Sequence, residues 1–130
     1  MKLRSRNASE VLLITALPEA HDCLVSSLRR RGIEVSVAHG GNAALRRLGR
    51  GPAVVLVDLV HGAGLDRTSV SRINRTRGRS LIVALHAGGF GQFHGAVEDL
   101  SVDGFCPVED WHPIAGLAGA ATATCSAQPH

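Results

Sequence analysis

Several residue types are scarce in this chain of 130 residues, and each scarcity excludes something. The three cysteines, Cys23, Cys106 and Cys125, lie far apart and show neither a disulfide framework nor a metal-site spacing such as C-x-x-C. No apolar run approaches the length that a membrane span requires, and no apolar signal core follows the basic N-terminus. We therefore expect a cytoplasmic protein with unpaired thiols.

The motifs of common catalytic and nucleotide-binding sites are missing as well. No G-x-G-x-x-G sequence follows a predicted strand and there is no Walker loop, so nucleotide binding has no support. No Ser-His-Asp or Cys-His arrangement appears with its supporting motifs. With one Trp, three Phe and no Tyr, and without a recognition motif, the chain is also a poor candidate for nucleic-acid binding. The sequence favours a protein that is not an enzyme and that needs no cofactor.

Charge is present but unevenly divided along the chain. Residues 1–79 contain all 14 Lys and Arg residues and six acids, which gives a net charge of +8. Residues 80–130 contain no Lys or Arg and five acids, which gives −5. Such an asymmetry is typical of a protein whose two parts meet different partners.

The hydrophobic pattern alternates between strand and helix periods along one predicted domain, residues 10–121, with tails at 1–9 and 122–130. Apolar or alternating runs predict strands at 11–15, 33–37, 53–57, 81–85 and 104–106. Helical spacing predicts helices that begin at Pro18, at Asn42 and at Asp66 or Thr68, a fourth over about 91–100, and a last one that carries Trp111, Ile114, Leu117 and Ala121. This alternation predicts an α/β fold in which helices cover both faces of a parallel sheet.

Four segments follow one another in a familiar order and spacing: VLLITALPEA, AVVLVDL, LIVALHA and VDGFCPVEDW. On these segments, the chain resembles the receiver domain of bacterial response regulators over residues 10–121, as a degenerate or pseudo-receiver variant. The resemblance implies a flavodoxin-like, three-layer α/β/α sandwich with five parallel strands in the order 2-1-3-4-5. It also implies a regulatory role in two-component signal transduction.

The resemblance assigns roles to residues at the strand ends, where the ligands of parallel sheets gather. Asp58 occupies the position of the phosphate-accepting aspartate. Thr15 and Ala16 replace the acidic pair, His86 replaces the switch hydroxyl, and Phe105 and Val108 fall at the switch aromatic and near the lysine. Mg²⁺ is held by oxygen ligands, so these replacements predict no magnesium site and no Mg²⁺-dependent phosphorylation. Asp58 is then either a carboxylate satisfied by loop amides or a residual phosphate acceptor in a phosphorelay.

Histidines provide further candidates around Asp58. The predicted layout puts His86 beside Asp58, and His61, three residues further on, can reach the same hollow. An Asp–His pair fills the space of a phosphoryl group and lowers the pKa of Asp58. Asp58, His61 and His86, with His39, are also acceptable zinc ligands, although their spacing matches no metal signature.

Arginines follow the predicted ends of the first three helices. In a parallel α/β sheet the helices run antiparallel to the strands, so their C-termini gather at one edge, where the helix dipole favours cations. We therefore predict a basic rim opposite Asp58, made of Arg29, Arg30, Arg31, Arg46, Arg47, Arg50, Arg75, Arg77 and Arg79.

These features predict that the chain acts through a protein partner or through self-association. Residues 91–121, which carry acids and no cations, are the candidate surface for a homodimer. A head-to-tail contact between the basic rim and the acidic part of another copy is a second form of self-association. A small ligand at the strand ends is the alternative, because Ala16, Leu17 and Val60 make that hollow apolar.

Overall fold

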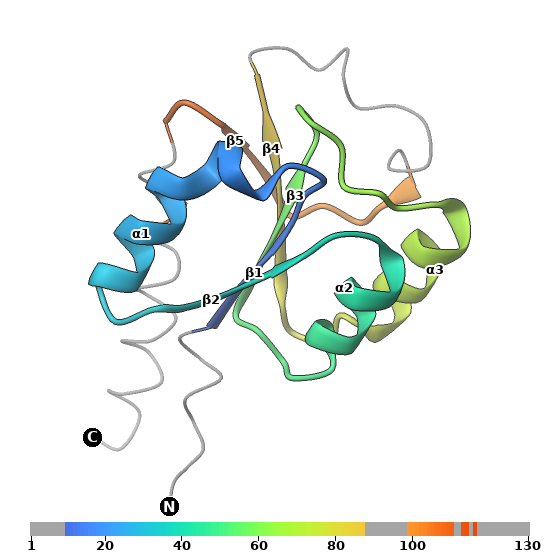
Figure 1. The fold of residues 1–130 in the computed structure, drawn as a ribbon. Coiled ribbons are helices and arrows are strands. Elements are labelled where there is room, and N and C mark those ends of the chain that lie inside the picture. The colour runs from blue at the N-terminus through green and yellow to red at the C-terminus, as the bar shows by residue number, and fades with distance from the viewer. Residues whose placement is uncertain (1–9, 88–98, 111–112, 115, 117–130) are drawn as a thin grey trace, which may run out of the picture.

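The computed structural model describes residues 10–87, 99–110, 113, 114 and 116, and these form a five-stranded parallel sheet with helices on both faces (Figure 1). The strand order is β2-β1-β3-β4-β5, as predicted. The elements are β1 (Glu10–Ile14), the 3-10 helix η2 (Pro18–His21), α1 (Asp22–Arg30), β2 (Glu34–Ala38), α2 (Gly41–Leu48), β3 (Val54–Asp58), α3 (Arg67–Thr76), β4 (Leu81–His86) and β5 (Gly104–Pro107).

The central strands are buried on both faces, which explains their continuous apolar sequences. Alternate residues of β1 and β3 enter two separate cores. Leu13 and Leu56 pack with Leu24 and Leu28 of α1 on one face of the sheet. On the other face the core contains Leu12, Ile14, Val55 and Val57 of the same two strands together with Ala44, Leu48, Val70 and Ile73 of α2 and α3. The molecule is therefore a three-layer sandwich, with α1 on one side and α2 and α3 on the other (Figure 1).

Most element boundaries fall where the sequence predicted them. The helix expected from Pro18 begins as the separate turn η2, and α1 follows it at Asp22. Asp66 caps α3 as expected, because its side chain accepts a hydrogen bond from the backbone N–H of Ser69. In α1, Leu24 and Leu28 are buried, whereas Cys23 is exposed.

Some predictions lie outside the described residues. These are the tails, nearly all of the helix expected over 91–100, and most of the last helix, including Trp111, Leu117 and Ala121. Ile114 of that last helix is described and is fully buried against the core on the α1 side. Within the described ranges no helix is long and apolar enough to cross a membrane.

The direction of the chain separates two ends of the molecule. All strands are parallel, so their carboxyl ends, including Asp58 at the end of β3, lie at one edge of the sheet. The C-terminal ends of α1, α2 and α3 lie toward the opposite edge (Figure 1). The candidate site at Asp58 and the C-terminal ends of these three helices therefore lie at opposite ends of the molecule.

Candidate functional site at the carboxyl end of the sheet

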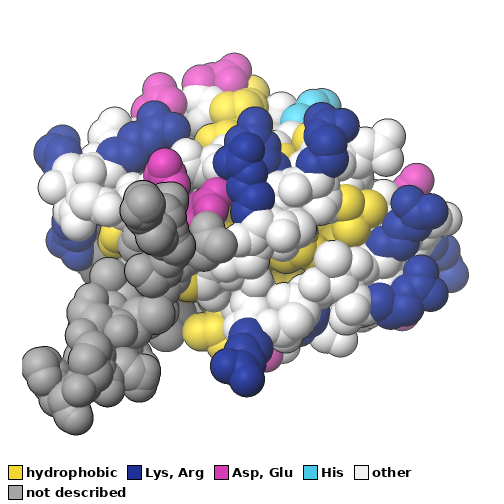
Figure 2. All heavy atoms as spheres, turned by 90° about the horizontal axis from the view of Figure 1, so that it is seen from below, with side chains coloured by type: hydrophobic (Ala, Val, Ile, Leu, Met, Phe, Trp, Pro, Cys, Tyr) yellow, Lys and Arg dark blue, Asp and Glu magenta, His cyan; other side chains and the backbone are white. Residues whose placement is uncertain are grey.

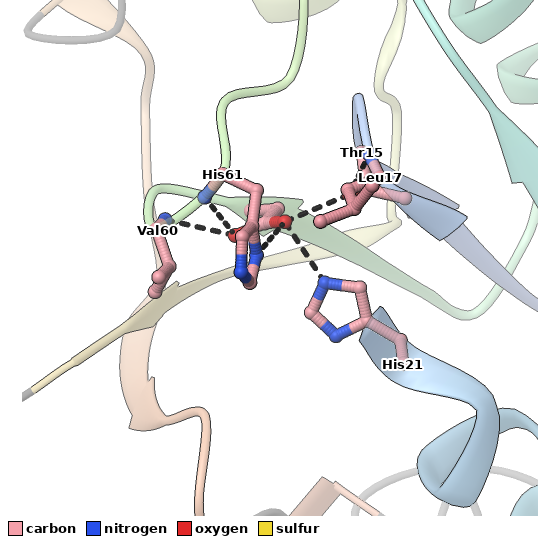
Figure 3. Close-up of polar contacts among 6 residues, drawn as sticks. Thr15, Leu17, His21, Val60 and His61 are labelled. Carbon is pink, nitrogen blue, oxygen red and sulfur yellow. Dashed lines mark hydrogen bonds and ion pairs between the residues drawn. The ribbon is translucent and has the colours of Figure 1, made fainter. Parts of the chain in front are cut away.

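Asp58 is the last residue of β3 and only 1% exposed, although β3 is otherwise made of Val and Leu. A buried carboxylate is costly unless hydrogen bonds replace its lost hydration. Figure 3 shows how the chain supplies them, with side chains converging on Asp58 from three segments. The segments are the end of β1, the turn η2, and the loop that follows β3.

Five donors from within the chain surround the two oxygens of Asp58 (Figure 3). Oδ1 accepts the backbone N–H groups of Val60 and His61, at 2.8 and 3.1 Å. Oδ2 accepts the Thr15 hydroxyl at 2.7 Å and faces His21 Nε2 at 2.8 Å and His61 Nδ1 at 3.2 Å. An ionised carboxylate has about four lone-pair sites, so Asp58 is saturated by its own chain.

His21 is the residue that the sequence did not single out. It ends η2, the turn that Pro18 begins, and only 3% of it is exposed. Because an ionised carboxylate only accepts hydrogen bonds, Nε2 of His21 carries the hydrogen that points at Asp58. Its position in the chain could have indicated this contact, because His21 comes shortly after the carboxyl end of β1, the strand next to β3 in the sheet.

The hydrogen bonds decide the ionisation of Asp58. Burial alone would raise the pKa of its carboxyl group, because burial disfavours the charged form. The hydrogen bonds from His21 and Thr15 act against burial and favour the carboxylate. With the backbone amides of His61 and Val60 added, they hold the pKa of Asp58 well below its usual range. Asp58 is therefore a carboxylate at any physiological pH.

Thr15 connects the end of β1 to Asp58 and to the loop that follows β1. Its side chain is buried and donates to Asp58, while its oxygen accepts the backbone N–H of Leu17 at 3.0 Å. The hydroxyl thus fixes the start of the loop that leads to η2. Ala16 donates its backbone N–H to the carbonyl oxygen of Gly62, so the loops after β1 and β3 are also joined through the main chain.

The remaining predicted residues lie on the side of β4 and β5. The ring of His86 makes an edge-on contact with Phe105, with ring centroids 6.3 Å apart, and Phe105 is 44% exposed. Val108 donates its backbone N–H to the carbonyl oxygen of His86 at 2.7 Å. The sequence predicted an imidazole beside Asp58 from His86 and a second from His61. The imidazoles that the structure brings to Oδ2 of Asp58 come from His21 and His61.

The fold matches those of solved receiver domains. The receiver domain of a sensor histidine kinase from Pseudomonas aeruginosa, with magnesium coordinated in its active-site cleft, is 22% identical with a TM-score of 0.64, and the match covers 85% of this chain and 97% of that one. A two-component response regulator from Clostridium difficile is 14% identical with a TM-score of 0.67, covering 88% and 95%. A response regulator from Burkholderia pseudomallei with a phosphorylated aspartic acid, calcium and citrate is 22% identical with a TM-score of 0.61, covering 92% and 72%.

No family model and no curated protein matches the sequence. The chain has the receiver-domain fold, as its sequence segments predicted. At identities of this order the structural match establishes the fold, and the chemistry of the site has to be derived from its own residues.

A magnesium ion does not fit the residues around Asp58. Mg²⁺ requires oxygen ligands in nearly octahedral geometry, usually including carboxylates. Beside Asp58 the chain offers the neutral hydroxyl of Thr15 and the imidazoles of His21 and His61. The methyl group of Ala16 provides no ligand. The side chains around Asp58 therefore provide imidazole nitrogens in place of the oxygen ligands that Mg²⁺ requires.

The predicted basic residues follow the C-terminal ends of three helices. Arg29, Arg30, Arg46, Arg47 and Arg75 lie in the last helical turns, and Arg31 and Arg77 are C-caps. Figure 2 views the molecule from below Figure 1 and shows Lys and Arg side chains at several separate places over this end. Arg77 is a structural residue, since it pairs with Asp103 and donates to the carbonyl oxygens of Ser80 and Ser101.

A groove of about 680 Å³ lies beside the edge strand β2 and between the ends of α1 and α2. Arg29, Arg47 and Arg50 line it together with Glu34. Arg29 donates to the carbonyl oxygen of Val35, while Arg50 is exposed. The groove is therefore basic and suits a partner with acidic groups.

Proposed function

We propose that this chain is an atypical receiver domain that acts in signal transduction or transcriptional regulation through protein–protein contacts, without Mg²⁺-dependent phosphorylation. The observation that carries the proposal is the saturation of Asp58 by five donors of its own chain. Phosphoryl transfer requires a carboxylate oxygen with a lone pair directed at the phosphorus atom and a cation that neutralises the developing charge. Here Oδ2 faces three hydrogen-bond donors instead.

Energy considerations support the same proposal. An acyl phosphate on Asp58 would convert one carboxylate oxygen into the bridging oxygen of a mixed anhydride and expel the side chains that now contact it. The resulting phosphoryl charge would meet neither a magnesium ion nor a lysine, because Val108 is near the position where the resemblance places the lysine. The polar side chains that remain, Thr15 and the two histidines, are already bound to Asp58.

The contacts that replace phosphorylation involve the basic end of the molecule. The exposed arginines there are Arg29, Arg30, Arg31, Arg46, Arg50, Arg75 and Arg79. Positive charge of this density favours an acidic partner, either another protein or the acidic part of a second copy. A homodimer through residues 91–121 is the other form of self-association; of that range the structure describes 99–110, 113, 114 and 116.

Incubation with acetyl phosphate and Mg²⁺, followed by intact-mass measurement, tests the proposal. We expect no mass increase of one phosphoryl group, whereas a metal-binding receiver domain treated in parallel shows one. A Mg²⁺ titration followed by amide NMR should leave the signals of Val60 and His61 unmoved at millimolar metal. A phosphoryl adduct that is present in the wild-type chain and absent from Asp58→Asn would overturn the proposal.

A further inference from the structure

The two imidazoles and the carboxylate at the end of β3 form a cluster of metal-ligating atoms. One ligand atom each from His21, Asp58 and His61 lies within 4.8 Å of the other two. We propose that this cluster is a site for Zn²⁺, with His21 Nε2, His61 Nδ1 and Asp58 Oδ2 as ligands. Two histidines and one carboxylate, with one position left open, are a donor set that zinc accepts.

Both distances from Asp58 Oδ2 to the histidine nitrogens are near the separation that a tetrahedral ion requires, and the two nitrogens lie within 4.8 Å of each other. Zinc–nitrogen and zinc–oxygen bonds of about 2.0–2.2 Å at tetrahedral angles separate neighbouring ligand atoms by roughly 3.4 Å. Asp58 Oδ2 lies 2.8 Å from His21 Nε2 and 3.2 Å from His61 Nδ1. Zinc binding therefore needs movements of a few tenths of an ångström to open these two pairs.

The surroundings of the three ligands favour a preformed site. The Asp58 side chain is fully buried and His21 nearly so, which fixes two ligands before a metal arrives. The His61 side chain is 34% exposed, which gives the ion a path from solvent and gives one ligand freedom to adjust. The rings of His21 and His61 stand nearly perpendicular, at 82°, with centroids 5.7 Å apart, so the two imidazoles meet edge to face beside Asp58.

The proton balance of binding is simple. Each coordinating nitrogen must present its lone pair, so the hydrogens that now point at Asp58 leave these two nitrogens. A neutral histidine changes tautomer, so that its one hydrogen moves to the other ring nitrogen, and a protonated histidine keeps that second hydrogen and releases one proton to solvent. The carboxylate is already ionised and stays so. Zinc thus takes the place of hydrogens that bridge the same atoms.

Bound zinc would also change the connections within the molecule. His21 belongs to η2 and His61 to the loop after β3, and the ion would hold both to the end of the central strand. In receiver folds ligands approach at this edge, where the strands end. The proposal is independent of phosphorylation, because a zinc site and a residual phosphate acceptor are detected by different measurements.

Calorimetric titration of the metal-stripped, full-length chain with ZnCl₂ in a buffer that does not chelate zinc is the direct test. We expect one ion per chain and a saturable isotherm. His61→Gln should weaken binding about tenfold or more, because even residues behind the direct ligands change metal affinity by 10- to 100-fold. His39→Gln is the matched control, since His39 is exposed and lies outside the cluster, and it should bind as the wild type does.

Cobalt substitution provides a second readout that does not depend on stability. Co²⁺ held by two nitrogens and one oxygen in a tetrahedral site gives strong visible absorption, while hydrated octahedral Co²⁺ gives almost none. We expect this absorption in the wild type and in His39→Gln, and its loss in His61→Gln. No saturable zinc binding, or binding and colour that His61→Gln leaves unchanged, would overturn the proposal.

Discussion

At the scale of single residues, Thr15 joins the end of β1 to Asp58 and to the loop that follows β1. It directly follows β1, donates to a buried carboxylate and accepts the amide of Leu17, all through one oxygen atom. A valine has nearly the same shape and can do neither. The hydroxyl therefore contributes to stability through its hydrogen bonds and not through its volume.

Replacement of Thr15 by Val should lower the free energy of unfolding by about 2 kcal/mol, because a hydrogen bond to a charged group is worth roughly 1.5–3 kcal/mol. Urea denaturation followed by circular dichroism measures the loss. Thr68→Val is the matched control, since Thr68 is exposed on α3, and its effect should stay within about 0.5 kcal/mol. Equal effects of the two substitutions would contradict this role for Thr15.

The site illustrates how much the sequence alone can tell. The resemblance to receiver domains pointed to Asp58, which directly follows a continuous apolar strand, and His61 lies only three residues further on. His21 is 37 positions from Asp58, and its approach depends on how tightly the chain turns after β1. The sequence predicted a helix starting at Pro18, and only the structure shows a short 3-10 turn that directs His21 inward.

At the scale of elements, α2 and α3 approach each other closely where Gly41 begins α2. A β-carbon on Gly41 would lie 1.8 Å from Ser69 Oγ and 2.6 Å from Ser69 Cβ. Rotation of the serine can move its oxygen but not its β-carbon. The glycine is therefore required by the distance between the two helices, and the fold predictions from periodicity contained no hint of it.

Gly41→Ala should destabilise the protein by about 1–3 kcal/mol, the usual cost of overpacking. Ser69→Gly removes the opposing β-carbon, so the double variant should recover much of that loss, with a coupling energy of about 0.5 kcal/mol or more. Thermal unfolding of the two single variants and the double variant measures the coupling. Gly49→Ala is the control, because its β-carbon would come no closer than 3.4 Å to other atoms. Simple additivity would contradict the proposed contact.

At the scale of the whole molecule, the arginines that follow α1, α2 and α3 are placed by the topology of the sheet. The hydrophobic periods predicted which segments are strands, and the resemblance to receiver domains supplied their order in the sheet. The sequence also predicts that arginines at helix C-termini gather at one edge, because parallel strands force the helices to end there. The sequence alone does not distinguish an arginine that faces solvent from one that binds its own chain. Arg77, which pairs with Asp103, is of the second kind.

Self-association through the basic end should weaken with salt. Light scattering at about 50 mM NaCl should give a larger mean mass than at about 500 mM, because screening shortens the range of exposed charges. Arg46→Glu with Arg75→Glu should abolish the difference. Arg67→Glu with Arg72→Glu, which makes the same charge change nearer the other end of α3, should preserve it. A monomer at low salt would rule out self-association and leave an acidic partner protein as the proposed ligand.

The outer edge of β2 has a consequence for the behaviour of the protein at high concentration. The Ala38 carbonyl points toward β1, where it accepts the amide of Thr15, so by strand alternation the Val35 carbonyl points outward. Arg29 occupies that carbonyl at 3.1 Å, and the exposed Glu34 stands beside it. Unprotected sheet edges recruit strands from other molecules and start amyloid-like aggregation, which charged edge residues oppose. Arg29, which we assign to a partner-binding surface, thus also opposes the pairing of the β2 edge with strands of other molecules.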